Sequence, residues 1–478
     1  MIKMQPSSQA RKLAGQLILP NWCARFGQDP ERWPYTGYIF HYHDLMAGAD
    51  STRRLLTSVH QSYSQQHLSP PIFAVTEEGG TVHRFPSLPP PPSALLAGQL
   101  DPSDIRTIGR LTAIMLAMYG LGWNLAPVLD CYVPKNYVVG TRSFGNEEIL
   151  SAAKSWIEGH KAIGIPVTIK HFPGHGHALK DSHKEAPIVN QHDKDWHQEM
   201  NSFVQFLSSS LVDAVMTAHI RFPEIDENPV TLSATWISDI LRERLAFKGV
   251  IVTDALSMQA IRMLFEPGAA AVQALMAGVD LVDCGGDDNV AEDILESVAR
   301  AIDSSRIPEP RIQASLKRIN RLKESILPSG MWAYTLAARS FYDQFIPLIN
   351  RGLEVRGNLS NFSLRSPRFW LTSSHQLEVE ERVFAKDFAV KRLDMDKPQS
   401  WADLLAQKPE QLVVFTENMW KSPFAIHQLN RLCRVKQVLQ VAVLDPLDAL
   451  QVAGAYGTIF LRGNPFYADS VITSILGP

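Results

Sequence analysis

A histidine- and glycine-rich stretch has the residue types that most clearly suggest chemistry. It reads KHFPGHGHALKDSH over residues 170–183, and five of the fifteen histidines lie between His171 and His192. One proline and two glycines disfavour a helix, so we expect a loop that leaves a strand. Imidazole exchanges protons near neutral pH, so this cluster favours acid/base chemistry. A zinc site at His171, His175 and His177 is the alternative, although the spacing is irregular and no carboxylate or thiolate obviously completes it.

A second stretch, FKGVIVTDALSM over residues 247–258, places Asp254 directly after an apolar run typical of a buried strand. An aspartate in this position is often only the cap of the following helix. If the histidine-rich loop lies at the same end of a sheet as Asp254, however, this carboxylate is a candidate nucleophile or acid/base.

Both stretches fit a longer regularity, because short apolar runs recur along the first two thirds of the chain and several end in ionisable residues. The expected strands are Tyr38–Tyr42, Ile72–Glu77, Leu125–Asp130, Val167–His171, Ala214–His219, Val250–Asp254 and Val279–Asp283. Helical patterns such as Ser103–Met118 and Ser233–Leu245 lie between them, which indicates βα units. In a closed parallel barrel the carboxyl ends of all strands converge on one mouth, so we predict an α/β fold with a TIM-type (β/α)8 barrel.

The remainder of the chain predicts a second unit. We expect the catalytic barrel over residues 1–326, a linker with one helix over 327–366, and a smaller α/β sandwich domain of the flavodoxin-like kind over 367–478. At the other end of the chain, a first helix is expected to bury Leu13, Leu17 and Ile18.

The composition of the 478 residues narrows the class of protein. Hydrophobic residues make up 45% and charged residues 20%, and the net charge is -3, which is typical of folded proteins and gives no reason to expect nucleic acid or an anionic membrane as partner. No apolar run approaches the ~18 residues that span a bilayer, and the N-terminus has no signal-peptide core. The four cysteines form no C-x-x-C pair. We therefore expect a cytoplasmic protein without a metal or other cofactor, of undetermined oligomeric state.

Five sequence blocks, taken together and in order, resemble the β-N-acetylhexosaminidase branch of glycoside hydrolase family 3. They are EEGGTVHRFP, APVLDCY…VVGTRSFG, KHFPGHG…DSH, MTAHIRFPEIDENPVTLS and FKGVIVTDALSM, and the resemblance covers residues 14–326. It implies a retaining exo-β-N-acetylglucosaminidase that removes terminal N-acetylhexosamine from peptidoglycan-derived fragments through a glycosyl-enzyme intermediate. The C-terminal part resembles, more weakly, the α/β sandwich domain of two-domain members.

The resemblance also implies residue roles. Asp254 matches the nucleophile, and His183 matches the general acid/base, which Asp181 orients. An imidazole in this position can protonate the leaving oxygen and then activate water. By the same matching, the side chains that hold the sugar are Arg84, Arg142, Lys170 and His171.

Three departures from the family pattern leave the function partly open. Thr76 stands where the family has an aspartate that clamps sugar hydroxyls, Thr81 stands where it has arginine, and His177-Ala178 replaces Asp-Thr. A lost hydroxyl contact alters specificity strongly. Three functions toward a small carbohydrate partner therefore stay open. The protein hydrolyses N-acetylhexosaminides, or it cleaves another β-glycoside by hydrolysis or phosphorolysis. In the third alternative it has impaired catalysis and only binds the sugar.

Overall fold

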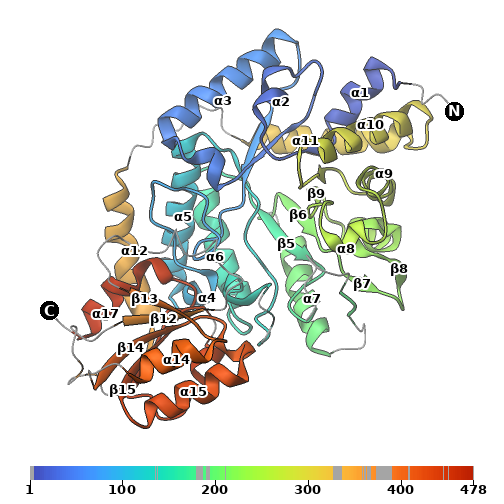
Figure 1. The fold of residues 1–478 in the computed structure, drawn as a ribbon. Helices are drawn as coiled ribbons and strands as arrows, with labels where there is room; N and C mark the ends of the chain where they lie inside the picture. Colours follow the sequence, from blue (N-terminus) through green and yellow to red (C-terminus); the bar gives the residue numbers. More distant parts are fainter. Residues whose placement is uncertain are drawn as a thin grey trace.

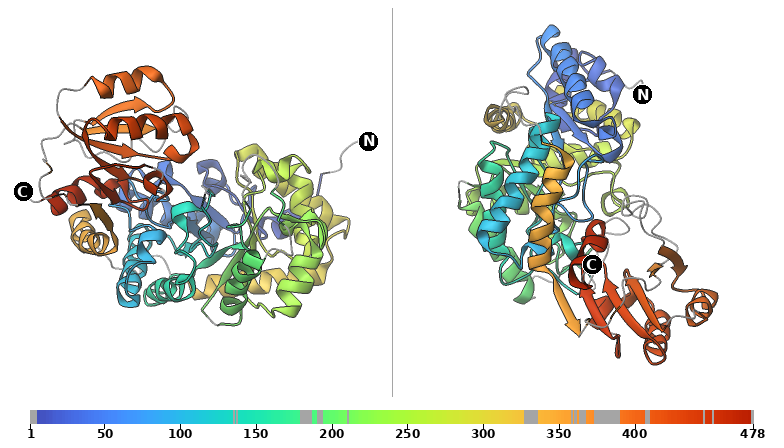
Figure 2. Two further views of the ribbon diagram at one scale, coloured as in Figure 1. Left: turned by 90° about the horizontal axis from the view of Figure 1, so that it is seen from below. Right: turned by 90° about the vertical axis from the view of Figure 1, so that its left-hand side faces the viewer.

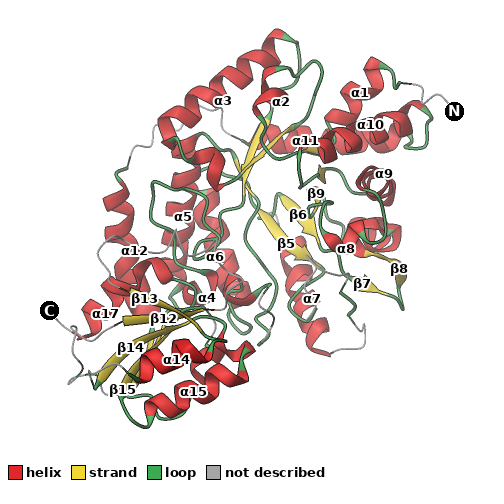
Figure 3. Ribbon diagram, in the orientation of Figure 1, coloured by secondary structure: helices red, strands yellow, loops and turns green. Residues whose placement is uncertain are grey.

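The structure, a computed structural model, is an α/β fold with parallel sheets. It describes residues 5–134, 136, 138–178, 187–189, 194–209, 211–326, 336–357, 359, 362, 368–372, 390–406, 410–444, 446–450 and 452–476. Figures 1 and 3 show short strands surrounded by helices in the larger, N-terminal part, and a separate sheet with its own helices towards the C-terminus. Figure 2 shows that this second sheet lies against one side of the larger part.

Eight short parallel strands form the centre of the larger part. They are β1 (Ile18–Leu19), β2 (Gly37–Phe40), β3 (Ile72–Val75), β4 (Trp123–Asn124), β5 (Thr168–Phe172), β6 (Ala214–Thr217), β9 (Val250–Thr253) and β10 (Val282–Asp283). Their ladders join β10 to β1, β2 to β3 and β4, and β5 to β6 and β9. Every residue of these strands is buried, as expected for parallel strands covered by helices.

Isolated parallel bridges lie between the three ladders. They pair Asn21 with Ile39, Asn124 with Val167, and Val252 with Leu281. Each bridge joins the edge of one ladder to the edge of the next, so the carboxyl ends of all eight strands face the same way. The antiparallel strands β7 (Arg221–Phe222) and β8 (Asp226–Pro229) form a small ribbon beside this group.

Helices cover the strands. They are α1 (Ser8–Gly15), α2 (Ala24–Gln28), α3 (Gly48–Gln65), α4 (Ala94–Ala97), α5 (Pro102–Tyr119), α6 (Ile149–Lys161), α7 (Lys194–Leu207), the π-helical η4 (Thr235–Arg244), α8 (Gln259–Arg262), α9 (Pro267–Ala277), α10 (Asp288–Asp303) and α11 (Glu309–Ser325). The Asp287 carboxylate caps α10 by accepting the N–H groups of Asn289 and Val290. Within the part of the chain that the structure describes, no helix is long and apolar enough to cross a bilayer.

Two local predictions were wrong. The first helix ends at Gly15, where an added Cβ would lie 2.3 Å from the carbonyl oxygen of Pro34, and the next apolar residues form β1 instead. The strand expected over Leu125–Asp130 begins earlier, as β4, and only an isolated bridge at Val128 follows it. Pro127 interrupts this segment and has no N–H for a ladder.

The C-terminal sheet has six strands in the order β11-β16-β15-β14-β12-β13. Its strands are β11 (Glu354–Gly357), β12 (Arg368–Thr372), β13 (Val390–Asp394), β14 (Gln411–Thr416), β15 (Gln437–Ala442) and β16 (Gly457–Phe460). All neighbours are parallel except β11, which lies within the predicted linker and pairs antiparallel with β16. Its helices are α14 (Pro398–Leu405), α15 (Pro423–Cys433), α16 (Leu447–Leu450) and α17 (Ala468–Leu476), and α12 (Ala338–Gly352) contacts α4, α5 and α17.

Candidate active site

Asp254 lies directly after β9, at the carboxyl end of the strand. Its N–H donates to a carbonyl oxygen at the end of β6 over 3.2 Å, and its carboxylate accepts the Ala255 N–H at 2.8 Å. Burial by itself raises the pKa of Asp254, but the surrounding groups outweigh burial and lower the pKa to about 2. These groups are, in decreasing order, His171, His219, the Ala255 N–H and Lys170. Asp254 is therefore an anion at neutral pH.

A buried carboxylate beside Asp254 holds two cations in place. Glu78 follows β3 by three residues, and its carboxylate accepts two hydrogen bonds from the Arg142 guanidinium, at 2.7 and 2.9 Å. The Lys170 ammonium lies 2.7 Å from the same carboxylate, and the side chains of Glu78 and Lys170 are each only 3% exposed. Burial opposes ionisation of Glu78, yet Arg142 and Lys170 hold its pKa well below the usual range. Glu78 thus neutralises only one of the two positive charges. The cluster of Glu78, Arg142 and Lys170 keeps a net positive charge, which interacts with the Asp254 carboxylate.

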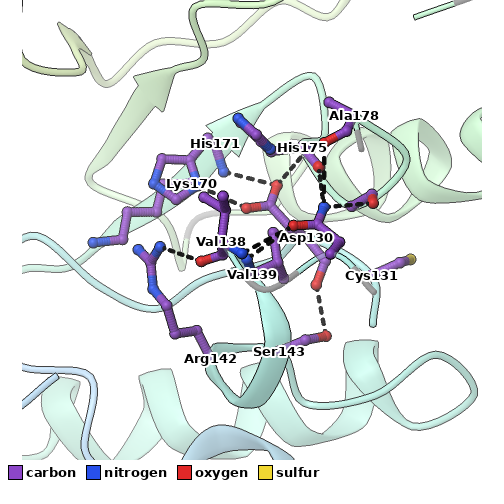
Figure 4. Close-up of polar contacts among 12 residues, drawn as sticks. Asp130, Cys131, Val138, Val139, Arg142, Ser143, Lys170, His171, His175 and Ala178 are labelled. Atoms are coloured by element: carbon purple, nitrogen blue, oxygen red, sulfur yellow. Dashed lines mark hydrogen bonds and ion pairs between the residues drawn. The ribbon is translucent and has the colours of Figure 1, made fainter. Parts of the chain in front are cut away.

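Asp130 fixes the start of the histidine-rich loop. Its carboxylate accepts the backbone N–H groups of His171, at 3.0 Å, and of His175, at 2.8 Å, and it lies 2.6 Å from Nδ1 of the His171 ring. Figure 4 shows these contacts converging on Asp130, with the side chains of Lys170 and Arg142 extending to one side. Burial favours the neutral acid, but the two histidines lower the pKa of Asp130. The His171 ring is therefore oriented by a carboxylate.

A second buried carboxylate, that of Glu199 on α7, holds the middle of the loop. It accepts the backbone N–H groups of Cys131, at 2.9 Å, and Gly176, at 2.8 Å, and it lies 2.8 Å from Nδ1 of His177. Added Cβ atoms at Gly174 and Gly176 would lie 2.6 and 2.7 Å from Glu199. The glycines of the loop are thus required for the close approach of Glu199, and His177 contributes to this anchor.

Arg84, another predicted sugar-holding residue, lies in a second cluster, which is centred on Glu77. Its backbone N–H donates to Glu77 Oε2 at 2.7 Å, and Nδ1 of His83 lies 3.1 Å from Glu77 Oε1. Burial and the nearby charge of Arg84 lower the pKa of His41, after β2, to about 4. Glu77 is buried and bound in this way, so it does not replace the aspartate that is missing at Thr76.

The structure brings Asp254, Arg142, Lys170 and His171 together. The other two predicted catalytic residues, Asp181 and His183, lie outside the described residues. In the described part of the chain, no group of three or more His, Cys, Asp or Glu side chains is arranged to hold a metal ion. The zinc alternative named His171, His175 and His177. Of these, His171 contacts Asp130 and His177 contacts Glu199, so these two rings bind different carboxylates.

Several residues of the site had no assigned role in the sequence analysis. Glu78, Asp130, His219 and Asp283 carry a signal that was visible there, because each stands at the carboxyl end of an expected strand. His219 lies against the carbonyl oxygen of Ala255, 3.1 Å from its Nε2. Glu199 carries no such signal, since it is one acidic residue within an ordinary amphipathic helix.

Comparisons with known proteins agree with this geometry. Residues 35–322 match the N-terminal domain of glycosyl hydrolase family 3. The chain is 30% identical over 263 residues to a β-hexosaminidase of Vibrio cholerae, covering 54% of this chain and 76% of that protein. It is 33% identical over 271 residues to a β-hexosaminidase of Nitrosomonas eutropha, covering 54% and 78%. The solved structure of a family 3 β-N-acetylglucosaminidase from Paenibacillus sp. superposes with a TM-score of 0.87 and 25% identity, covering 98% of this chain and 96% of that one.

Proposed function

The chain belongs to glycoside hydrolase family 3, and we propose that it cleaves terminal β-linked N-acetylhexosamine with Asp254 as the covalent nucleophile. The protein is a glycoside hydrolase, and its relatives named β-hexosaminidase support β-N-acetylglucosaminidase activity. The observation that carries the proposal is the state of Asp254: a partly buried carboxylate at a strand end that nearby positive charge keeps ionised. The predicted cytoplasmic role in recycling peptidoglycan-derived fragments is part of the same proposal.

The surroundings of Asp254 suit a retaining mechanism. Such an enzyme needs a carboxylate that attacks the anomeric carbon, while a second group protonates the leaving oxygen and later activates water. His171, His219 and Lys170 favour the ionised form of Asp254. As sugar-holding groups, Lys170 and Arg142 bring hydroxyls into register with it. His171, which Asp130 orients, has the same holding role in the proposal.

We assign the acid/base role to His183, with Asp181 as its partner. Their loop leaves β5 beside Asp254, and Asp130 and Glu199 fix its first residues up to Ala178. A histidine suits the role because its ordinary pKa lies near ~6.5, so it can both donate and accept a proton near neutral pH.

The fold in this proposal is the TIM-type barrel expected from the sequence. The three ladders and the bridges between their edges run in the ring order β1-β2-β3-β4-β5-β6-β9-β10, which supports closure. The strand order of the C-terminal sheet supports the flavodoxin-like class, because its parallel strands follow the order 2-1-3-4-5. Residues 1–326 and 367–478 are proposed as the two domains.

Hydrolysis of a panel of aryl β-glycosides tests the function. We expect turnover of the N-acetylglucosaminide at a rate that phosphate does not change, and a fall in kcat of about 10⁴-fold or more in Asp254→Asn. Asp287→Asn is the matched control, because it changes a carboxylate of the same size at an exposed helix cap. His183→Ala should slow substrates with poor leaving groups more than activated ones.

Two results contradict the proposal. Turnover by Asp254→Asn within a few fold of the wild-type rate would remove the nucleophile assignment. Saturable binding of sugars without turnover of any glycoside would instead identify a sugar-binding protein, and a requirement for phosphate would identify a phosphorylase.

A further inference from the structure

One turn of the C-terminal part is buried against the larger part. It follows β16 and comprises Leu461 to Asn464 and the 3-10 helix η6 (Pro465–Tyr467), and we call residues 461–467 the docking turn. Asn464 is 1% exposed and Tyr467 is 0% exposed. The turn therefore packs as part of a core, although it belongs to the second sheet.

Hydrogen bonds join the docking turn to the segment that follows β3. Asn464 Oδ1 accepts the Ser93 N–H at 2.8 Å, and Asn464 Nδ2 donates to Ser93 Oγ at 3.2 Å. Ser93 Oγ donates to the Arg462 carbonyl oxygen, and the Tyr467 hydroxyl donates to the Pro90 carbonyl oxygen at 2.8 Å. Every polar group of the Asn464 side chain is thus used, which gives the contact a defined geometry.

The tip of the turn reaches the two loops that build the ion-pair cluster. A Cβ added at Gly463 would lie 2.6 Å from Thr141 Oγ1, and a Cβ added at Gly80 would lie 2.7 Å from the Gly463 carbonyl oxygen. Both glycines have positive φ, +82° and +56°. Thr141 directly precedes Arg142, and Gly80 lies two residues after Glu78. The turn therefore packs against the loops that carry Glu78 and Arg142.

We infer that the docking turn is a positioning element of the active site: it holds the loops of Glu78 and Arg142 at the separation their ion pair requires. The inference deepens the proposed function and rests on it. Because Arg142 and Lys170 are both held by Glu78, a displaced loop also changes the positive charge around Asp254. The C-terminal domain thus acts on the chemistry through the geometry of the sugar-holding cations.

The test compares two glycine substitutions in the full-length protein. Gly463→Ala adds a methyl group at positive φ and against Thr141. Gly454→Ala is the matched control, because it adds the same group at φ +86°, in an exposed loop of the same sheet, 3.9 Å from its nearest neighbour. Asn464→Ala removes the hydrogen bonds to Ser93 without adding bulk. Its control is Asn430→Ala, because Asn430 accepts the N–H of Ala453, a residue of the same C-terminal part.

Three measurements are expected to separate the variants. In Gly463→Ala and Asn464→Ala, kcat/KM for an aryl N-acetylglucosaminide falls by about 10- to 100-fold, as for misplaced binding groups. The acid limb of the pH profile of kcat/KM moves to higher pH, since displaced cations depress the pKa of Asp254 less. Hydrogen exchange becomes faster in segments 78–84 and 138–144. The two controls keep the wild-type kinetics, pH profile and exchange.

The inference is overturned if the docking-turn variants and their controls share the same pH profile and the same exchange in those segments, even when both lose stability. Hydrogen exchange needs no substrate, so it decides the inference even if the wild-type protein hydrolyses no glycoside. A wild-type protein that hydrolyses no glycoside would contradict the proposed function and not this inference.

Discussion

Two buried carboxylates surrounded by cations lie at opposite ends of the parallel strands. Glu78 lies at the carboxyl ends and binds Arg142 and Lys170. Asp280 lies at the amino ends, two residues before β10, and is 0% exposed. The groups that contact Asp280 are the guanidinium groups of Arg242, Arg311 and Arg318, the Ser315 hydroxyl and the Ile251 N–H.

The difference between the two clusters lies in what their excess positive charge meets. The arginines around Asp280 are 12–26% exposed and come from η4 and α11, so water screens them while the carboxylate connects helices to strands. Around Glu78 the Lys170 side chain is only 3% and the Arg142 side chain 21% exposed, and the charge of Lys170 lowers the pKa of Asp254. The same residue types therefore connect elements at one end of the strands and act on Asp254, the proposed nucleophile, at the other.

The largest expected effect is on stability. Asp280→Asn leaves three arginines without their shared anion and should lower the free energy of unfolding by about 3–5 kcal/mol. The kcat of the folded protein should be unchanged, because the cluster lies at the far end of the strands. Urea unfolding together with active-site-normalised kinetics measures both quantities.

Asp104→Asn is the control for that prediction. It breaks an exposed ion pair with Arg351, 2.8 Å long, which should contribute less than ~1 kcal/mol. A loss of kcat in Asp280→Asn at unchanged stability would remove the distinction between the two clusters.

The next effect is on activity. Glu78→Gln removes the anion that orients Arg142 and Lys170, so we expect kcat/KM to fall about 10²- to 10³-fold in the fraction that remains folded. Glu158→Gln, at the exposed pair with Arg106, should leave kcat/KM unchanged. If Glu78→Gln lost stability alone, both clusters would be structural.

The sequence predicted the active-site cluster better than the cluster around Asp280. Strand ends can be recognised from apolar runs, so Asp254, Lys170 and His171 were predicted together, with Arg142 matched by its block. Asp280 was only one position within an expected strand, because its arginines come from helices whose faces become neighbours only in the folded chain. Single-sequence patterns do not contain such contacts between distant elements.

The same reason limits prediction of the fold. A long helix with clear caps such as α5 was predicted nearly to its ends, since capping and periodicity are local. The short strand β1 was predicted as helix, because its few apolar residues fit either period and only the pairing with β10 selects the strand. The docking turn has no local signal at all: Asn464 and Gly463 gain their role from Ser93 and Thr141, more than three hundred residues away.

A third carboxylate, Asp283 at the end of β10, sharpens the comparison because it stands at the same end of the strands as Glu78, and no cation of the described residues forms an ion pair with it. Burial, and then the charge of Asp254, raise its pKa from 3.8 to about 7. The folded protein therefore keeps a proton that the unfolded chain releases between these pH values, and stability present below about pH 4 is lost as the pH rises towards 7.

Asp283→Asn should remove this loss, which amounts to about 1.4 kcal/mol for each unit of pKa shift and so to a few kcal/mol at pH 8. The amide still offers an oxygen to the Gly285 N–H, which the carboxylate accepts at 2.8 Å, so the variant should match the wild type near pH 4 and exceed it at pH 8. Urea unfolding at both pH values measures the difference, with Asp239→Asn on the exposed face of η4 as control. Asp254 does not interfere, because its pKa is lowered to about 2, so the stability that it contributes is present above about pH 4 and changes only below that pH. Equal pH dependence in Asp283→Asn and the wild type would mean that Asp283 is ionised beside Asp254, and that the positive charge held by Glu78 serves two anions instead of one.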